Sequence, residues 1–253
     1  MNARRPPTSL VFGSAGFSLV ELLIGLAAGS VVMAATIQTL AHLERRFAGQ
    51  QEAMVQHQDL RIGLGVLEAE LRLAGSGSAP SAAALTKSTP DEVEFLANLS
   101  GLVTVLTIAA SAGERDLAVR SGADWPKGKR VLVCDQTRCE DSRLARDGRS
   151  TRLSLATPLG AAFPAGAVVY VSNTVRYYLR PEAAGLSQVM RQVDGGAGAL
   201  IGSVSRFRLT YLGAEGQPTA DPRRVSRIAV ELAVGRDPQP ITSLVGLSAR
   251  RTV

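Results

Sequence analysis

The pattern of hydrophobic and polar positions begins with a long apolar segment. From Leu22 to Leu43 there are 22 residues without an aspartate, glutamate, lysine or arginine. A helix needs about 20 such residues to cross the hydrocarbon core of a bilayer, and a helix satisfies all of its own backbone groups there. The segment therefore predicts a membrane-spanning helix.

Helical spacing continues beyond the apolar segment. A regular leucine stripe is formed by Leu60, Leu64, Leu67 and Leu71. A less regular apolar stripe precedes it and consists of Leu43, Phe47 and Met54. No proline occurs from Phe17 to Gly77, and Gly75 and Gly77 supply a stop signal. We predict one helix from Phe17 to Leu73, whose second half lays an apolar face on a globular domain. A coiled coil is the alternative for that half, but Gly63 and Gly65 interrupt its stripe, so we expect packing on a sheet.

Short runs of β-forming residues dominate the rest of the chain. Residues 75–91 predict a loop rich in serine, alanine and proline, and Asp194–Gly202 a hairpin loop. The expected strands are Val93–Ala97, Leu102–Ala109, Asp116–Arg120, Arg130–Cys134, Thr151–Ala156, Ala167–Val171, Val175–Arg180, Leu186–Val193, Val204–Leu212, Val225–Val234 and Ile241–Ser248. The predicted fold class is α+β, a long N-terminal helix packed on a C-terminal antiparallel β-sheet domain.

Composition and charge add two constraints. Hydrophobic residues make up 45% of the chain and aromatic residues only 4%, so the core is expected to consist mainly of valine, leucine, isoleucine and alanine. The formal net charge of +6 is mild and spread along the chain. No run of lysine and arginine with interleaved aromatic residues occurs, so we expect no nucleic-acid partner.

Two cysteines, Cys134 and Cys139, lie in the sequence C-D-Q-T-R-C. A disulfide across a tight turn is the favoured interpretation. It would stabilise the fold by about 2 kcal/mol and would require an oxidising compartment such as the periplasm. Free thiols are the alternative. A zinc site is disfavoured because zinc needs about four ligands, and the only histidines, His42 and His57, lie in a different segment.

The chain carries no pattern typical of an enzyme. It has no Ser/His/Asp arrangement, P-loop, G-x-G-x-x-G or zinc-ligand spacing, so we expect no enzymatic activity, no cofactor and no metal. An acidic cluster could bind calcium, but interspersed arginines predict a solvated charged loop instead; its members are Asp135, Glu140, Asp141 and Asp147.

Glu21 is the unusual residue of the apolar segment, because a carboxylate within a membrane span costs about 2–3 kcal/mol near the centre and less near the end. Either the helix begins at Leu22, with Glu21 at its hydrated edge, or Glu21 has a function. Gly25 and Gly29 form a G-x-x-x-G spacing that permits close helix packing, although small residues are also common in membrane helices.

The run G-F-S-L-V-E-L-L-I-G, from Gly16 to Gly25, closely resembles the processing motif of type IV prepilins and type II secretion pseudopilins. The resemblance implies that a prepilin peptidase cleaves after Gly16 and methylates the new terminus at Phe17. It also implies that Glu21 pairs with the N-terminus of a neighbouring subunit in the filament core and so sets the register of assembly.

A looser resemblance extends to the C-terminal half. The stretches GKRVLVCDQTRC, LIGSVSRFRLTYLGAEGQP and DPRRVSRIAVELAV resemble PilW-type minor pilins and, next, J-type minor pseudopilins. The implied function is a minor type IV pilin that primes pilus assembly at the filament tip. The implied partners are the prepilin peptidase, other minor pilins, the major pilin, the inner-membrane assembly platform and, before assembly, membrane lipid.

The resemblance also implies four segments and a location. We expect a cleaved leader at 1–16, a transmembrane half-helix at 17–43, an amphipathic half-helix at 44–74 and a globular domain at 75–253. The chain would cross the bacterial inner membrane once, with this domain in the periplasm, before entering a filament. The alternatives are a minor pseudopilin of a type II secretion system and a periplasmic binding domain on an uncleaved anchor. A cleaved secretory signal is disfavoured because the apolar segment exceeds 7–15 residues.

Overall fold

The structure, a computed structural model, describes residues 18–79, 82–235 and 239–247. The predicted cleavage residues Gly16 and Phe17 lie outside this part of the chain. Two compact units can be distinguished, residues 1–52 and residues 53–253, and each is described by itself.

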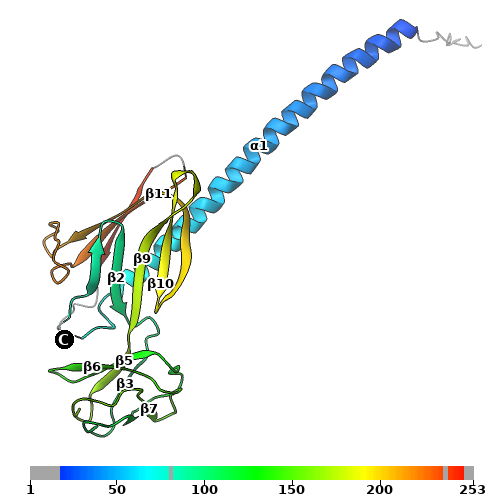
Figure 1. Cartoon of the computed structure of the whole chain (residues 1–253). Coiled ribbons are helices and arrows are strands. Elements are labelled where there is room, and N and C mark those ends of the chain that lie inside the picture. Colours follow the sequence, from blue (N-terminus) through cyan, green and yellow to red (C-terminus); the bar gives the residue numbers. More distant parts are fainter. Residues whose placement is uncertain (1–17, 80–81, 236–238, 248–253) are drawn as a thin grey trace, which may run out of the picture. The chain divides into compact units, whose positions relative to one another are not determined.

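The predicted long helix is confirmed. Helix α1 runs without interruption from Leu19 to Arg72 (Figure 1), which places its ends within two residues of the expected ones. Its first turn is closed by bonds from the amides of Glu21 and Leu22 to the carbonyl of Ser18. After the helix, Gly75 adopts a positive φ of 92°, a conformation that ends helices and that glycine adopts without strain.

The largest sheet has seven antiparallel strands in the order β1-β2-β9-β10-β11-β12-β13. Figure 1 shows its strands β2, β9 and β10 side by side. The strands are β1 (Leu85–Thr89), β2 (Glu92–Ala97), β9 (Asn173–Pro181), β10 (Ser187–Val193), β11 (Gly196–Leu212), β12 (Arg227–Val234) and β13 (Ile241–Gly246), with a short 3-10 helix, η1 (Ala183–Gly185), before β10. The coarse α+β prediction is thereby confirmed.

The remaining strands form two smaller sheets. A four-stranded antiparallel sheet has the order β3-β8-β5-β6, and β4 pairs with β7 in a two-stranded ribbon. Strands β3, β5, β6 and β7 appear together in green in Figure 1. Their bounds, with those of β4 and β8, are β3 (Val103–Val105), β4 (Asp116–Ala118), β5 (Arg130–Cys134), β6 (Cys139–Arg143), β7 (Arg152–Ser154) and β8 (Val168–Val171).

The regular leucine stripe of the helix is buried against the seven-stranded sheet. Leu60, Leu64, Leu67 and Leu71 share one core with buried residues of all seven strands, including Phe95 of β2. Burying each leucine stabilises the fold by about 1.5–3 kcal/mol. The predicted packing of this half of the helix on a sheet is therefore confirmed.

The earlier, irregular part of the stripe behaves differently. Leu43, Phe47 and Met54 are all exposed. Met54 and Leu60 are six residues apart, an interval that places them on different sides of the helix. From Leu60 onward the leucines recur at steps of four, three and four, and they enter the core.

Gly63 allows the helix backbone to approach strand β11 closely. A Cβ atom at this position would lie 2.3 Å from Cγ1 of Ile201, a side chain that is itself buried. Gly65 lies two residues further along the helix, and a Cβ atom there would meet nothing within 4 Å. Of the two glycines that interrupt the stripe, Gly63 therefore has a packing role, whereas Gly65 faces open space.

This difference gives a matched pair of substitutions with opposite expected signs. Gly63→Ala should lower the free energy of unfolding by about 1 kcal/mol, because overpacking at Ile201 outweighs the gain in helix propensity. Gly65→Ala should raise it by about 0.5–1 kcal/mol, because only the propensity gain applies. Urea unfolding in detergent micelles, followed by circular dichroism, measures both. Equal effects at the two positions would contradict the close approach at Gly63.

The β region departs from the expectations in three places. Residues 75–91 are not all loop, because they contain β1. The hairpin turn expected within Asp194–Gly202 is confined to Asp194 and Gly195, because β11 begins at Gly196. Strand β6 was not predicted. Strands β1 and β6 escaped detection because they are edge strands with polar sequences, LTKST and CEDSR, as edge strands often are. Within Asp194–Gly202, glycine and alanine residues of β11 pair with β10 despite their low β-propensity.

Several carboxylates in residues 53–253 have a lowered pKa. A hydrogen bond from Ser243, helped by Arg72, lowers the pKa of Glu68. Burial raises the pKa of Glu92, but hydrogen bonds from Arg176 and Lys87 outweigh this and leave that pKa below its ordinary value. In each case the folded state holds the proton more weakly than the unfolded chain does.

Acid should therefore destabilise the fold. Because the folded pKa values of Glu68 and Glu92 are lowered, their contribution is fully present above the unfolded value of about 4.3 and is lost as the pH falls through the folded values. The urea midpoint at constant ionic strength should be similar at pH 7 and pH 6 and should decrease steadily below about pH 4. A midpoint that rises on acidification would contradict these assignments.

Candidate functional site

The N-terminal part of α1 is the candidate site, because it is apolar and none of it is buried. Leu19–Phe47 has a mean hydropathy of 2.0 over its most apolar window and no buried residue there. At 1.5 Å per residue, these 29 residues span about 43 Å, which exceeds the bilayer core of about 30 Å. By length and composition, the described chain therefore has one helix that can cross a membrane.

Hydroxyl groups within this segment bond to their own helix. The side chains of Ser30, Thr36 and Thr39 donate to backbone carbonyls three or four residues earlier, at 2.7–2.8 Å. A hydroxyl bonded in this way does not enter an apolar medium with an unsatisfied donor. These polar residues are therefore compatible with lipid or with a dry protein core.

Glu21 lies in the first turn of α1 and is exposed. Because Leu19 and Val20 precede it within the helix, the interpretation that the helix begins at Leu22 is wrong. A negative charge in the first turn is favoured by the helix dipole, by about 0.3–1 kcal/mol. The carboxylate thus stands at the end of the apolar segment, where it can meet a positive group from outside this chain.

Gly25 and Gly29 follow Glu21 at intervals of four residues, so the three lie along one side of the helix. A Cβ added at either glycine would meet no other atom of the chain within 4 Å. Both positions are therefore accessible to a second helix. The expected packing role of the two glycines stays a prediction.

Cys134 and Cys139 form a disulfide. They lie opposite each other, at the end of β5 and the start of β6, with Cα atoms 4.1 Å apart. The four intervening residues turn around Asp135, whose Oδ1 accepts hydrogen bonds from the amides of Thr137 and Arg138. These bonds lower the pKa of the Asp135 carboxyl. The disulfide therefore closes a tight turn that has its own polar support.

The acidic residues considered for calcium have separate protein partners. Glu140 accepts from the amide of Gly160, Asp141 pairs with Arg130 at 2.9 Å, and Asp147 accepts from the amide of Lys127. Within the residues that the structure describes, no group of three histidine, cysteine, aspartate or glutamate side chains could hold a metal ion.

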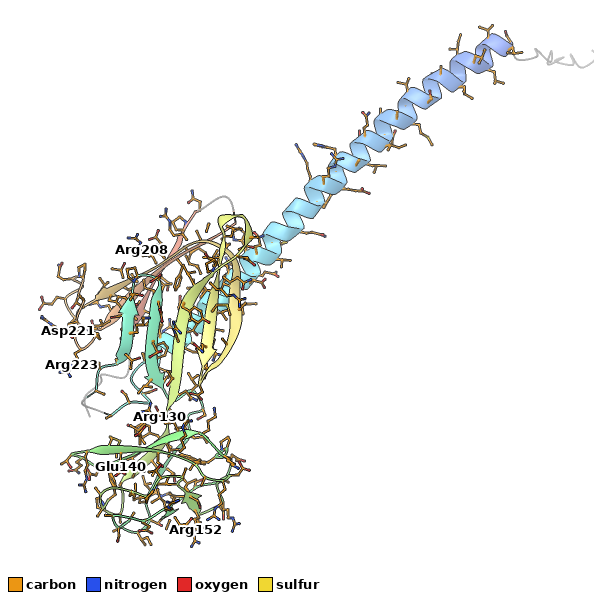
Figure 2. All side chains as sticks on the ribbon, in the orientation of Figure 1. Arg130, Glu140, Arg152, Arg208, Asp221 and Arg223 are labelled. Atoms are coloured by element: carbon orange, nitrogen blue, oxygen red, sulfur yellow. A yellow bond between two sulfur atoms is a disulfide. The ribbon has the colours of Figure 1, made fainter. Side chains whose placement is uncertain are left out.

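Arginines and acids are interspersed over residues 53–253. Figure 2 shows Arg130 and Glu140 in the same part of the chain, and Arg223 beside Asp221. Carboxylates pair with Arg72, Arg130, Arg138, Arg146, Arg176, Arg191 and Arg206. The expectation that the chain has no nucleic-acid partner stays a prediction.

Sequence reasoning missed the polar contacts that dock the helix on the sheet. The Glu70 carboxylate accepts a hydrogen bond from the Tyr177 hydroxyl of β9 and pairs with the Arg191 guanidinium of β10, with Nε of Arg191 2.9 Å from Oε2. Burial raises the pKa of the fully buried Tyr177 above its ordinary value, and the bond to Glu70 adds to this. The one available signal was an acid directly beside Leu71 of the apolar stripe.

A comparison of the chain with protein-family models, with characterised proteins and with solved structures finds no match.

Proposed function

We propose that this chain is a prepilin, a non-enzymatic subunit that the prepilin peptidase cleaves after Gly16 and that is then built into a filament. The observation that carries the proposal is the position of Glu21. It lies in the first turn of α1, at the start of the 29-residue apolar segment Leu19–Phe47, and is the fifth residue after the predicted cleavage point. An ordinary membrane anchor has no need of a carboxylate there, and one within the apolar layer is costly.

Filament assembly gives that carboxylate a partner. Cleavage creates a new amino terminus at Phe17, and in a water-free bundle of such helices its positive charge needs a counter-ion. Glu21 of a neighbouring subunit supplies it at one axial offset only, so that the charge pair sets the register of the two helices. The exposed side of α1 at Gly25 and Gly29 is available for the close helix contacts that such a bundle requires.

Within this class we propose a minor type IV pilin of the PilW type, at the filament tip, because the sequence of β11 and β12 resembles that family. Before assembly, α1 would hold the chain in the inner membrane, with the sheets on the periplasmic side. That location is in keeping with the disulfide, which forms in an oxidising compartment. The partners would be the other minor pilins, the major pilin and the inner-membrane assembly platform.

A minor pseudopilin of a type II secretion system is the second candidate, because the motif from Gly16 to Gly25 is common to both classes. An epitope-tagged chain expressed in bacteria that possess both machines distinguishes them. The minor-pilin proposal expects the chain in sheared surface pili, and expects this signal to disappear when the major pilin is deleted. Recovery with the pseudopilus alone would select the second candidate, and absence from both fractions would contradict filament assembly.

A further inference from the structure

Residues 53–253 contain two separate hydrophobic cores. The first joins the second half of α1 to the seven-stranded sheet, and the second is built from residues between Leu106 and Val171. No buried residue belongs to both. The second core includes Trp125, Leu153 and Phe163, and it fills the space between the four-stranded sheet, the β4–β7 ribbon and their loops.

The chain enters and leaves this second core at one point. Strand β2 ends at Ala97 and strand β9 begins at Asn173, and these two residues are paired neighbours in the seven-stranded sheet. The amide of Leu99 also donates to Oδ1 of Asn173, at 3.2 Å. Residues 98–172 are therefore an insertion between two adjacent antiparallel strands, a position at which whole domains are tolerated.

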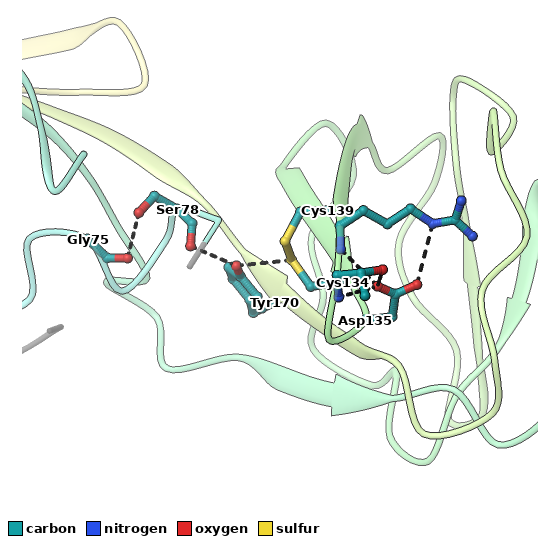
Figure 3. The surroundings of a disulfide bond; sticks show 8 residues. Gly75, Ser78, Cys134, Asp135, Cys139 and Tyr170 are labelled. Atoms are coloured by element: carbon teal, nitrogen blue, oxygen red, sulfur yellow. Dashed lines mark hydrogen bonds and ion pairs between the residues drawn. A yellow bond between two sulfur atoms is a disulfide. The ribbon is translucent and has the colours of Figure 1, made fainter. Parts of the chain in front are cut away.

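Polar contacts connect the insertion to the rest of its unit. The hydroxyl of Tyr170 donates to the carbonyl of Ser78, in the segment that follows α1, and lies 3.2 Å from the Sγ atom of Cys134 (Figure 3). A second contact joins Nζ of Lys129 to Oδ2 of Asp194, in the turn between β10 and β11, at 3.0 Å. Both side chains of this pair are about one-third exposed, so water weakens their attraction.

We propose that residues 98–172 form an inserted module that unfolds and refolds as a cooperative unit of its own, while α1 and the seven-stranded sheet (the host) remain folded. Two cores without a shared buried residue give each part its own source of stability. The joint between them consists mainly of polar contacts, together with Leu99 at the start of the insertion, which is partly buried against the first core. The Cys134–Cys139 disulfide lies within the module and stabilises the module alone. The proposal does not depend on the assignment as a prepilin.

Hydrogen exchange of the full chain in detergent micelles, read by mass spectrometry, tests the proposal. Leu153→Ala removes a fully buried side chain from the module core, and Leu67→Ala is the matched substitution in the host core. Leu153→Ala should accelerate the slowest amides of the module by roughly 100-fold or more and leave those of the host unchanged. Leu67→Ala should do the reverse.

Two further measurements keep the test decisive if Leu153→Ala does not fold. Val169→Ala is a milder change in the same core and should accelerate exchange in the module alone. A dithiol added to the unmodified chain is oxidised to its own disulfide as Cys134 and Cys139 become thiols, and this too should affect only the module. Acceleration of host amides to the same extent, by either module variant or by the dithiol, would overturn the proposal.

Discussion

Replacing Glu70 by alanine should lower the free energy of unfolding by about 3 kcal/mol. The carboxylate accepts hydrogen bonds from Tyr177 and Arg191, and its side chain is only 12% exposed. Its removal leaves a fully buried tyrosine hydroxyl without its acceptor and a largely covered guanidinium without its counter-ion. Removing one member of such a group costs more than the net interaction contributes, because the remaining groups stay desolvated.

Urea unfolding of the full chain in micelles measures this loss in the free energy of unfolding. Two further variants serve as comparisons. Glu215→Ala removes an exposed acid in the β11–β12 loop and should change stability by less than about 0.5 kcal/mol. Tyr177→Phe keeps the buried ring and removes only the hydroxyl, so it should cost less than Glu70→Ala. If Glu70→Ala costs no more than Glu215→Ala, the polar docking of helix and sheet is refuted.

Replacing Glu21 by glutamine should reduce incorporation into filaments by roughly 100-fold, or below detection. The substitution keeps the size of the side chain and removes its charge, so the amino terminus of the neighbouring subunit loses its counter-ion in a dry core. Membrane insertion should persist, because an amide is less costly than a carboxylate in an apolar layer. The sheared-filament assay gives the incorporated amount, and membrane fractionation gives the amount of chain available for assembly.

Glu44→Gln is the control for that result. Glu44 lies on the same helix and is exposed, directly after the uncharged run Leu22–Leu43. Its loss removes an identical charge from a position with no expected partner, so incorporation should be unchanged. Equal incorporation of the Glu21→Gln variant and the unmodified chain would eliminate the proposed charge pair.

The helix could be predicted from the sequence because the features that specify it lie close together along the chain. Leu60, Leu64, Leu67 and Leu71 repeat at the helical period, the chain up to Gly75 contains no proline after Phe17, and the observed bounds follow from these features. The contacts that dock it could not be predicted. Arg191 lies 121 residues from Glu70, and no local pattern relates the two.

The division into two hydrophobic cores could not be predicted from the sequence either. Strands of both cores have the same short alternating pattern, so residues 75–253 predicted one β domain, although β2 pairs across the insertion with β9. Pairing between distant strands depends on which edges meet, and alternation along a single strand carries no information about this. The polar edge strand β6 was missed for a related reason, since its place is fixed by its pairing with β5 and the disulfide.

The candidate site shows the same contrast between local and non-local information. The motif from Gly16 to Gly25 is local, so its residues could be named from the sequence, and the structure adds that Glu21 belongs to the first turn of the helix. The partner expected to meet Glu21 is another chain, and neither one sequence nor one subunit contains it.

The most direct test of the prepilin proposal is the intact mass and N-terminal sequence of the chain after co-expression with an active prepilin peptidase. A known prepilin, processed in the same cells, serves as the control for peptidase activity. The proposal predicts a chain that begins at Phe17 and is heavier by one methyl group than residues 17–253. A chain that still begins at Met1 beside a fully processed control would contradict it.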